Sequence, residues 1–234
     1  MRTNLRPAHR RAAISVAAAA VLGISAAALA TSANAAGAPT AKPAGPAWSR
    51  ACDLPAPGLA ACDALHVNNV PEHIRALGVT PNATPSGFGP ADLRSAYKLP
   101  ANGGAGQTVA IVDAYNDPNA AADMAVYRSQ FGLPACTVAS GCFKQVSQTG
   151  STTSLPANNS GWAGEISLDL DMVSAIAPNA HIILVEAKTP TTANLGTSVN
   201  EAVKLGAKFV SNSYGGSESS ADLTQDTEIG RAHV

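Results

Sequence analysis

Apolar and polar positions along the chain follow two patterns, one typical of buried strands and one typical of helices. Short apolar runs bounded by turn formers predict strands, whereas apolar residues recurring every three to four positions predict helices. The expected strands are 108–113, 143–148, 180–186 and 208–213, and the expected helices are 119–131 and 194–205. Strands alternating with helices predict right-handed crossovers and a parallel sheet covered by helices on both faces, which is an α/β fold.

The segment Glu165–Met172 is ambiguous, because it alternates polar and apolar residues as a half-buried strand does. On a strand, Glu165 and Asp169 would lie roughly 13 Å apart, at about 3.3 Å per residue. On a helix they lie one turn apart, with Cβ atoms roughly 5–6 Å from each other, and only then can the carboxyls hydrogen-bond. Gly164 could begin such a helix and Pro178 would end it, so we expect a helix here. By itself this spacing most often marks a solvated helix face.

Charge and the N-terminal region limit the possible functions. The formal net charge of the 234 residues is −1, which gives no electrostatic basis for binding nucleic acid or an anionic membrane. Residues 1–35 have a basic start, the apolar run Ala12–Ala30 and the small-residue cleavage pattern Ala33-Asn34-Ala35 of an export signal. A membrane anchor is the alternative, since the apolar run is nearly long enough to span a bilayer. We expect a secreted, extracellular monomer, free of the membrane once the signal is removed.

Four cysteines fit an oxidising destination and can pair in three ways. The pairing favoured by sequence proximity joins Cys52 to Cys62 and Cys136 to Cys142. A zinc site is the alternative, but no histidine or further cysteine lies at ligand spacing. We therefore expect two short disulfide loops and no metal bound by these thiols.

Four segments, in a fixed order, carry a family resemblance. They are the stretch 89–100, the motif Gly164-Glu165-x-x-x-Asp169, the motif Ala177-Pro178-x-Ala180 with the strand after it, and the stretch 211–216, Ser-Asn-Ser-Tyr-Gly-Gly. Together they resemble the sedolisins, or serine-carboxyl peptidases, a family with a subtilisin-like fold. The resemblance covers roughly residues 89–226. It implies a serine-type endopeptidase that acts on polypeptides at acidic pH.

The resemblance also implies roles for individual residues. Glu165 would be the general base for a serine nucleophile, and Asp169 would orient Glu165. Asp113 ends a predicted strand, where open α/β sheets place their sites, and an acidic residue there extends the carboxylate network in sedolisins. A turn-capping role for Asp113 is the alternative. The substrate-binding residues would be Ser213, Tyr214 and Gly215, pairing with the extended substrate backbone.

Other parts of that reaction are expected outside this chain. They are a serine in a Gly-Thr-Ser setting near the C-terminus, an aspartic acid that donates to the oxyanion, and a calcium site. We therefore expect a truncated and inactive fragment. The expected parts are an export signal (1–35), an Ala/Pro/Gly-rich linker (36–50), a short pre-segment (51–88), the N-terminal part of a catalytic domain (89–227) and a tail of non-native origin (228–234).

Two other functions remain open. A relative that uses a Ser/His/Asp triad would need a histidine at a helix start, and none of His66, His73 or His181 has that setting. A secreted binding module with a peptidase-like fold and no catalytic activity is the second alternative, favoured by the missing nucleophile.

Overall fold

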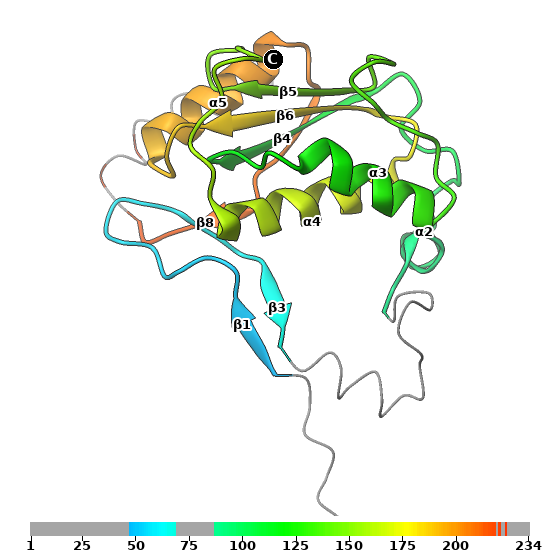
Figure 1. Cartoon of the computed structure of the whole chain (residues 1–234), viewed down its shortest axis with the longest axis horizontal. Coiled ribbons are helices and arrows are strands. Elements are labelled where there is room, and N and C mark those ends of the chain that lie inside the picture. The colour runs from blue at the N-terminus through cyan, green and yellow to red at the C-terminus, as the bar shows by residue number, and fades with distance from the viewer. Residues whose placement is uncertain (1–46, 69–86, 219, 221–222, 224–234) are drawn as a thin grey trace, which may run out of the picture. The chain divides into compact units, whose positions relative to one another are not determined.

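A four-stranded parallel sheet forms the centre of the computed structural model, which describes residues 47–68, 87–218, 220 and 223. Its strand order is β5-β6-β4-β7, and Figure 1 shows β5, β6 and β4 running side by side. The strands are β4 (Thr108–Ala114), β5 (Phe143–Ser147), β6 (His181–Ala187) and β7 (Phe209–Ser211). All three pairings are parallel, so the predicted α/β class with a parallel sheet is confirmed.

Helices cover both faces of this sheet. They are α2 (Pro90–Tyr97), α3 (Ala120–Gln130), α4 (Ser160–Ile176) and α5 (Thr192–Lys204). Alternate residues of a strand point to opposite faces. Ile111 of β4 therefore packs with residues of α3 and α4, whereas its neighbour Val112 packs with Ala202 of α5. The buried, nearly continuous apolar sequence of β4 follows from this double cover.

Helix α4 resolves the ambiguity of the segment around Glu165 in favour of a helix. It begins at Ser160, so the prediction that Gly164 opens it is wrong by four residues. The physical reason is Asn159, whose side-chain oxygen accepts hydrogen bonds from the backbone N–H groups of Gly161 and Trp162, each at 3.1 Å. This N-cap satisfies two otherwise unpaired donors of the first turn. The helix ends at Ile176, just before Pro178, as expected.

Three short strands lie in the N-terminal region, one at the end of the expected linker and two in the expected pre-segment. They are β1 (Trp48–Arg50), β2 (Ala61–Cys62) and β3 (Leu65–Val67). β1 pairs antiparallel with β3, and β2 pairs antiparallel with β8 (Tyr214–Gly215) near the chain's other end. At two or three residues each, these strands are too short for a periodic signal in the sequence.

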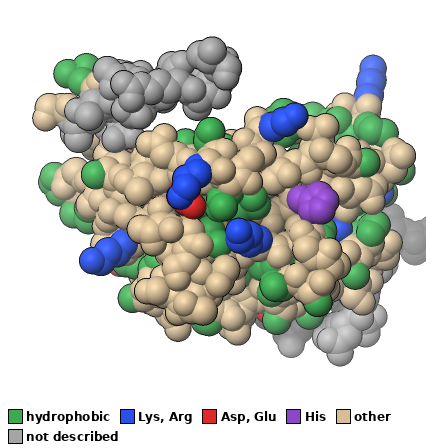
Figure 2. Space-filling view, turned by 90° about the horizontal axis from the view of Figure 1, so that it is seen from above, with side chains coloured by type: hydrophobic (Ala, Val, Ile, Leu, Met, Phe, Trp, Pro, Cys, Tyr) green, Lys and Arg blue, Asp and Glu red, His purple; other side chains and the backbone are tan. Residues whose placement is uncertain are grey.

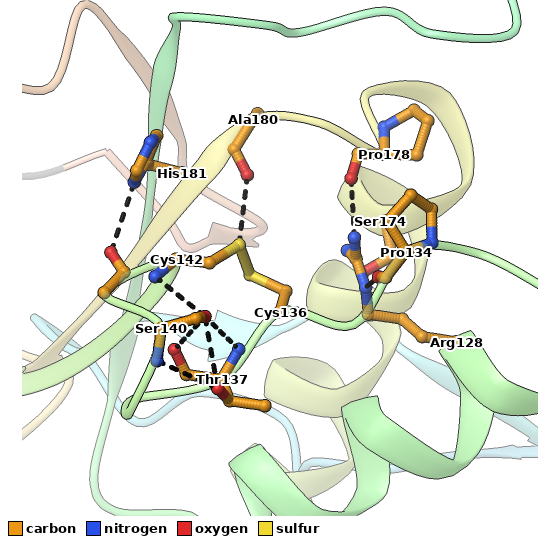
Figure 3. The surroundings of a disulfide bond; sticks show 11 residues. Arg128, Pro134, Cys136, Thr137, Ser140, Cys142, Ser174, Pro178, Ala180 and His181 are labelled. Atoms are coloured by element: carbon orange, nitrogen blue, oxygen red, sulfur yellow. Dashed lines mark hydrogen bonds between the residues drawn. A yellow bond between two sulfur atoms is a disulfide. The ribbon is translucent and has the colours of Figure 1, made fainter.

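Both expected disulfides are present. Cys52 is joined to Cys62 and Cys136 to Cys142, so the pairing favoured by sequence proximity is confirmed. Figure 3 shows the surroundings of the second bridge, where the side chain of Arg128 reaches across to α4. Arg128 is almost fully buried, and it donates to Ser174 Oγ at 2.9 Å and to two backbone carbonyls. These bonds tie α3 to the end of α4.

Some predictions concern residues outside the described ranges. The export signal, most of the linker and the C-terminal tail lie there.

Among the helices that are described, none has the length and apolar character to cross a membrane. Figure 2 shows one face of the molecule, on which the Lys and Arg side chains lie singly rather than in a patch.

Candidate active site

Glu165 and Asp169 lie one turn apart on α4 and are both buried, with 2% and 8% of their surfaces exposed. This burial argues against a solvated helix face. Around them, Ile166 and Leu170 of the same helix enter the hydrophobic core. Two carboxyl groups are therefore held at the inner surface of the helix, where an ionised group is costly.

Glu165 accepts a hydrogen bond at Oε2 from the backbone N–H of Ala64, at 2.6 Å. Ala64 belongs to the pre-segment, 101 residues earlier in the chain. Burial, and then the charge of Asp169, raise the pKa of Glu165 to about 7, while backbone hydrogen bonds from Ala64 and Asp63 oppose the rise. Glu165 can therefore exchange a proton close to neutrality, as a general acid or base must.

Asp169 is held by the candidate substrate strand. Its Oδ1 accepts a hydrogen bond from Ser213 Oγ at 2.8 Å, and its Oδ2 has no partner within the described part of the chain. Burial raises the pKa of Asp169, and the Ser213 hydrogen bond opposes that rise. In this state Asp169 thus acts on Glu165 through its charge rather than through a hydrogen bond.

Asp113 is fully buried at the end of β4, and neither of its carboxylate oxygens has a hydrogen-bond partner among the described residues. Burial first, and then the charges of Asp169, Glu165 and Glu186, raise its pKa well above the ordinary value. The turn-capping alternative is therefore not supported. Asp113 lies electrostatically coupled to the pair on α4, and these carboxyl groups cannot all be ionised together at low cost.

Glu186 is a further buried carboxylate, coupled to Asp113, that the sequence reasoning missed. It lies opposite Asp113 in the β4–β6 register and is fully buried. Its Oε1 accepts hydrogen bonds from Gln145 Nε2 and from the backbone N–H of Asp117, at 2.8 and 3.0 Å. Burial is the main cause that raises its pKa to about 7. The available signal was its position. Like Asp113, Glu186 is the second-last residue of a strand that is mostly buried.

The three candidate substrate residues line one edge of this site. Ser213 contacts Asp169, whereas Tyr214 and Gly215 form β8 and pair with Cys62 and Ala61 of β2. The Tyr214 ring packs near Trp162 of α4, with ring centroids 6.3 Å apart. The strand expected to receive a substrate backbone is therefore already paired with the pre-segment.

One Gly-Thr-Ser triplet occurs in the chain, at residues 196–198, although the sequence reasoning placed this motif only outside it. The triplet lies within α5, on the face of the sheet opposite α4. Ser198 is fully buried, and its hydroxyl donates to the carbonyl of Asn194 at 3.1 Å. Ser198 is thus a core residue remote from Glu165.

A calcium site is expected only in the complete protein, outside this chain. No group of three or more His, Cys, Asp or Glu side chains among the described residues is arranged to hold a metal ion. The four cysteines are all consumed by disulfides.

No protein-family model matches the chain. Kumamolisin from Bacillus sp. (strain MN-32) is 31% identical over 146 residues, which cover 59% of this chain and 25% of kumamolisin. A solved structure of Pseudomonas sedolisin, a serine-carboxyl proteinase complexed with two molecules of pseudo-iodotyrostatin, aligns with a TM-score of 0.48 and 22% identity. That alignment covers 64% of this chain and 40% of the sedolisin chain, and the present chain spans about a quarter of the length of kumamolisin.

Proposed function

Because the chain is related to the sedolisins, we propose that it is the N-terminal part of the catalytic domain of a secreted serine-carboxyl endopeptidase. The observation that carries this proposal is the buried pair Glu165 and Asp169, one turn apart on α4, with Asp113 coupled to them at the end of β4. Peptide hydrolysis suits this arrangement, because three interacting carboxyl groups lie beside β8, a strand that pairs with extended backbone. The proposed substrates are polypeptides, and the proposed compartment is extracellular.

In the proposed reaction Glu165 takes the proton of a serine hydroxyl as the serine attacks the peptide carbonyl. It then returns a proton to the leaving amine, so that an acyl-enzyme forms and is hydrolysed by water. Asp169 supports this role because its negative charge raises the proton affinity of Glu165. Asp113 is electrostatically coupled to the pair, because burial and then the charges of Asp169, Glu165 and Glu186 raise its pKa well above the ordinary value.

The pH dependence follows from how much water reaches Glu165. While the pre-segment covers it, its pKa is about 7, so it is mostly protonated in acid. Contact with water would return the pKa of Glu165 toward its ordinary value of 4.5. We therefore expect activity in acid only from the uncovered site, with an acid limb set by the Glu165/Asp169 pair.

The serine nucleophile and the oxyanion donor are proposed to come from sequence beyond this chain. Ser198 is buried on the wrong face of the sheet, and Ser213 donates its hydroxyl to Asp169. Removing a nucleophile abolishes most of the rate gain, because catalytic groups act as a unit. The 234-residue chain alone should therefore hydrolyse no peptide bonds. Calcium is proposed for the complete protein only.

One observation favours the second candidate function, a peptide-binding module without catalysis. Strand β8 already pairs with an extended segment through its backbone. Strand addition of this kind gives affinity without any chemistry.

The test is a pH–rate profile of the complete gene product on a denatured protein substrate. Glu165→Gln and Asp169→Asn should each remove most of kcat and leave the protein folded. Glu218→Gln, which changes an exposed glutamate, is the matched control. Full activity of Glu165→Gln, or a neutral-to-alkaline optimum, would refute Glu165 as the base. Peptide binding without hydrolysis at any pH would favour the binding module.

A further inference from the structure

Glu186, near the end of β6, is a buried carboxyl group that the proposed reaction does not use. One of its oxygens is held firmly, because Oε1 accepts hydrogen bonds from Gln145 Nε2 at 2.8 Å and from the backbone N–H of Asp117 at 3.0 Å. In the described part of the chain, no Lys, Arg or His side chain forms an ion pair with Glu186. A proton held by Glu186 therefore lies on Oε2, the oxygen without these two donors.

Asn116 is the residue that Glu186 Oε2 faces. When Asn116 Nδ2 donates to Asn158 Oδ1 at 2.6 Å, the side-chain oxygen of Asn116 lies 2.9 Å from Glu186 Oε2 and 3.0 Å from Oε1. In this orientation Gln145 Nε2 also donates to Asn116 Oδ1, at 3.1 Å. The contact between Asn116 and Glu186 then joins two acceptor oxygens, and it becomes favourable when Oε2 carries a proton and donates it.

The opposite orientation of the Asn116 amide has the opposite requirement. The oxygen and nitrogen of an amide have nearly the same shape, so the group can turn by half a rotation within the same space. Nδ2 then donates to both oxygens of Glu186, at 2.9 and 3.0 Å, which suits an ionised carboxylate. The oxygen of Asn116 now faces Asn158 Oδ1 at 2.6 Å, so Asn158 must turn as well.

The backbone allows both side chains to turn without separating the two segments. Asn116 donates its N–H to the carbonyl of Ala157 at 3.0 Å, and Asn159 donates its N–H to the carbonyl of Asn116 at 3.3 Å. Asn158 is exposed, so its amide has room to reorient. Because Asn159 is the N-cap of α4, the contact between Asn116 and Asn158 lies beside the start of the helix that carries the carboxylate pair.

The ionisable groups that face Glu186 are acidic. Asp113 of β4 is its register partner, on a strand about 4.8 Å away, so the two carboxyl groups point to the same face of the sheet. Asp117 faces Glu186 from the turn after β4, whereas β5 contributes the neutral Gln145 and the acidic pair of α4 acts on Asp113. Burial, helped by the charge of Asp117, raises the pKa of Glu186 to about 7 against the effect of its hydrogen bonds. Glu186 therefore exchanges its proton near neutrality.

We propose that Glu186 is a pH-dependent switch whose proton sets the direction of a hydrogen-bond chain from β6 through Asn116 to Asn158, at the start of α4. With the proton, Glu186 donates to Asn116, which donates to Asn158. Without the proton, Asn158 donates to Asn116, which donates to Glu186. The inference goes beyond the proposed function, because it concerns how α4 is held and does not depend on peptide cleavage by the complete protein.

The proton of Glu186 reaches the carboxylate pair by two routes. One route is the contact at the start of α4, whose donors and acceptors exchange places when Glu186 ionises. The other is Asp113, whose pKa the charge of Glu186 raises. In acid Glu186 is neutral, so it adds no charge beside Asp113 and the chain runs from Glu186 toward Asn158.

The test follows the side-chain amides of Asn116 and Asn158 by ¹⁵N NMR of the full chain, from about pH 5 to about pH 8, a range that brackets the pKa of Glu186. The carboxyl ¹³C signal of Glu186 is recorded on the same samples. The samples are the unaltered chain, Glu186→Gln and the matched control Glu201→Gln. Glu201 is also a buried glutamate, but it lies on α5, at the opposite face of the sheet.

In the unaltered chain both amide signals should shift together, with a midpoint of about 7 that coincides with the midpoint of the Glu186 carboxyl signal. Glu186→Gln should abolish the whole shift, because glutamine has an amide NH₂ in place of Oε2 and donates to Asn116 at every pH. Glu201→Gln should titrate like the unaltered chain.

A further variant separates Glu186 from its other acidic neighbour. Asp117→Asn removes the charge that raises the pKa of Glu186 but keeps the backbone N–H that Glu186 Oε1 accepts. Both amide signals should still titrate in this variant, with a lower midpoint. Loss of the titration would assign the response to Asp117 and overturn the inference.

Other results would overturn it as well. Amide signals that do not change with pH in the unaltered chain would show that Asn116 keeps one orientation whatever the state of Glu186. A shift that persists in Glu186→Gln would assign the response to another carboxyl group. If Glu186→Gln does not fold, the unaltered chain decides, because an amide midpoint that differs from the Glu186 carboxyl midpoint would rule out the switch. The proposed function stands or falls separately, on the kinetics of the complete protein.

Discussion

Glu165→Gln should change how the stability of the chain depends on pH. In the folded chain Glu165 is buried and its pKa is about 7, against an ordinary value of 4.5. The folded state therefore binds the proton more tightly than the unfolded state. Between these two values unfolding releases a proton, so the free energy of unfolding decreases as pH rises and becomes level above about pH 7.

The size of this effect follows from the two pKa values. A tenfold change in proton affinity is about 1.4 kcal/mol, so a pKa rise from 4.5 to about 7 corresponds to at most about 3.5 kcal/mol. Glutamine cannot ionise, yet its carbonyl oxygen can still accept the hydrogen bond from Ala64. The variant should therefore lack this part of the pH dependence and gain stability relative to the unaltered chain above pH 7.

Urea unfolding, followed by tryptophan fluorescence from about pH 4.5 to about pH 8, measures the effect. The quantity to compare is the difference in free energy of unfolding between variant and unaltered chain at each pH. Glu218→Gln removes an exposed carboxylate and should leave that difference flat. If Glu165→Gln and the unaltered chain lose stability in parallel as pH rises, burial of an ionised Glu165 is not costly and the reasoning fails.

Three further predictions concern single side chains. Asn159→Ala should lower the free energy of unfolding by about 1 kcal/mol, because Gly161 and Trp162 lose their shared acceptor; unchanged urea unfolding would contradict the cap. Ser213→Ala should raise the pKa of Asp169 further, since the Ser213 hydrogen bond is what lowers it; a carboxyl ¹³C titration by NMR with no change would exclude that contact. Leu170→Ala should lower the free energy of unfolding by about 2–5 kcal/mol, because Leu170 is fully buried between α4 and the sheet; a loss below 1 kcal/mol in urea unfolding would place it outside the core.

Local pattern in the sequence was enough for the main sheet and for helices α3, α4 and α5, whereas α2 was not predicted. The apolar run of β4 must be buried on both faces, and the intervening helices follow from the crossovers that parallel strands require. The two disulfides could also be inferred, because loops closed by cysteines close in sequence form readily. The helical spacing of Glu165 and Asp169 was correct, although Asn159 moved the start of the helix to Ser160.

Tertiary structure decided the environment of the carboxylates. Glu165 is covered by Ala64, 101 residues away, and Asp113 faces Glu186 only because β4 and β6 pair in one register. Such contacts leave no periodic trace, since each depends on how distant segments meet. The same holds for β2, two residues long, and for the buried Gly-Thr-Ser triplet on α5. The sequence identified most of the carboxyl groups of the candidate site. Their pKa values depend on burial and on neighbouring charges, which arise only when the chain has folded.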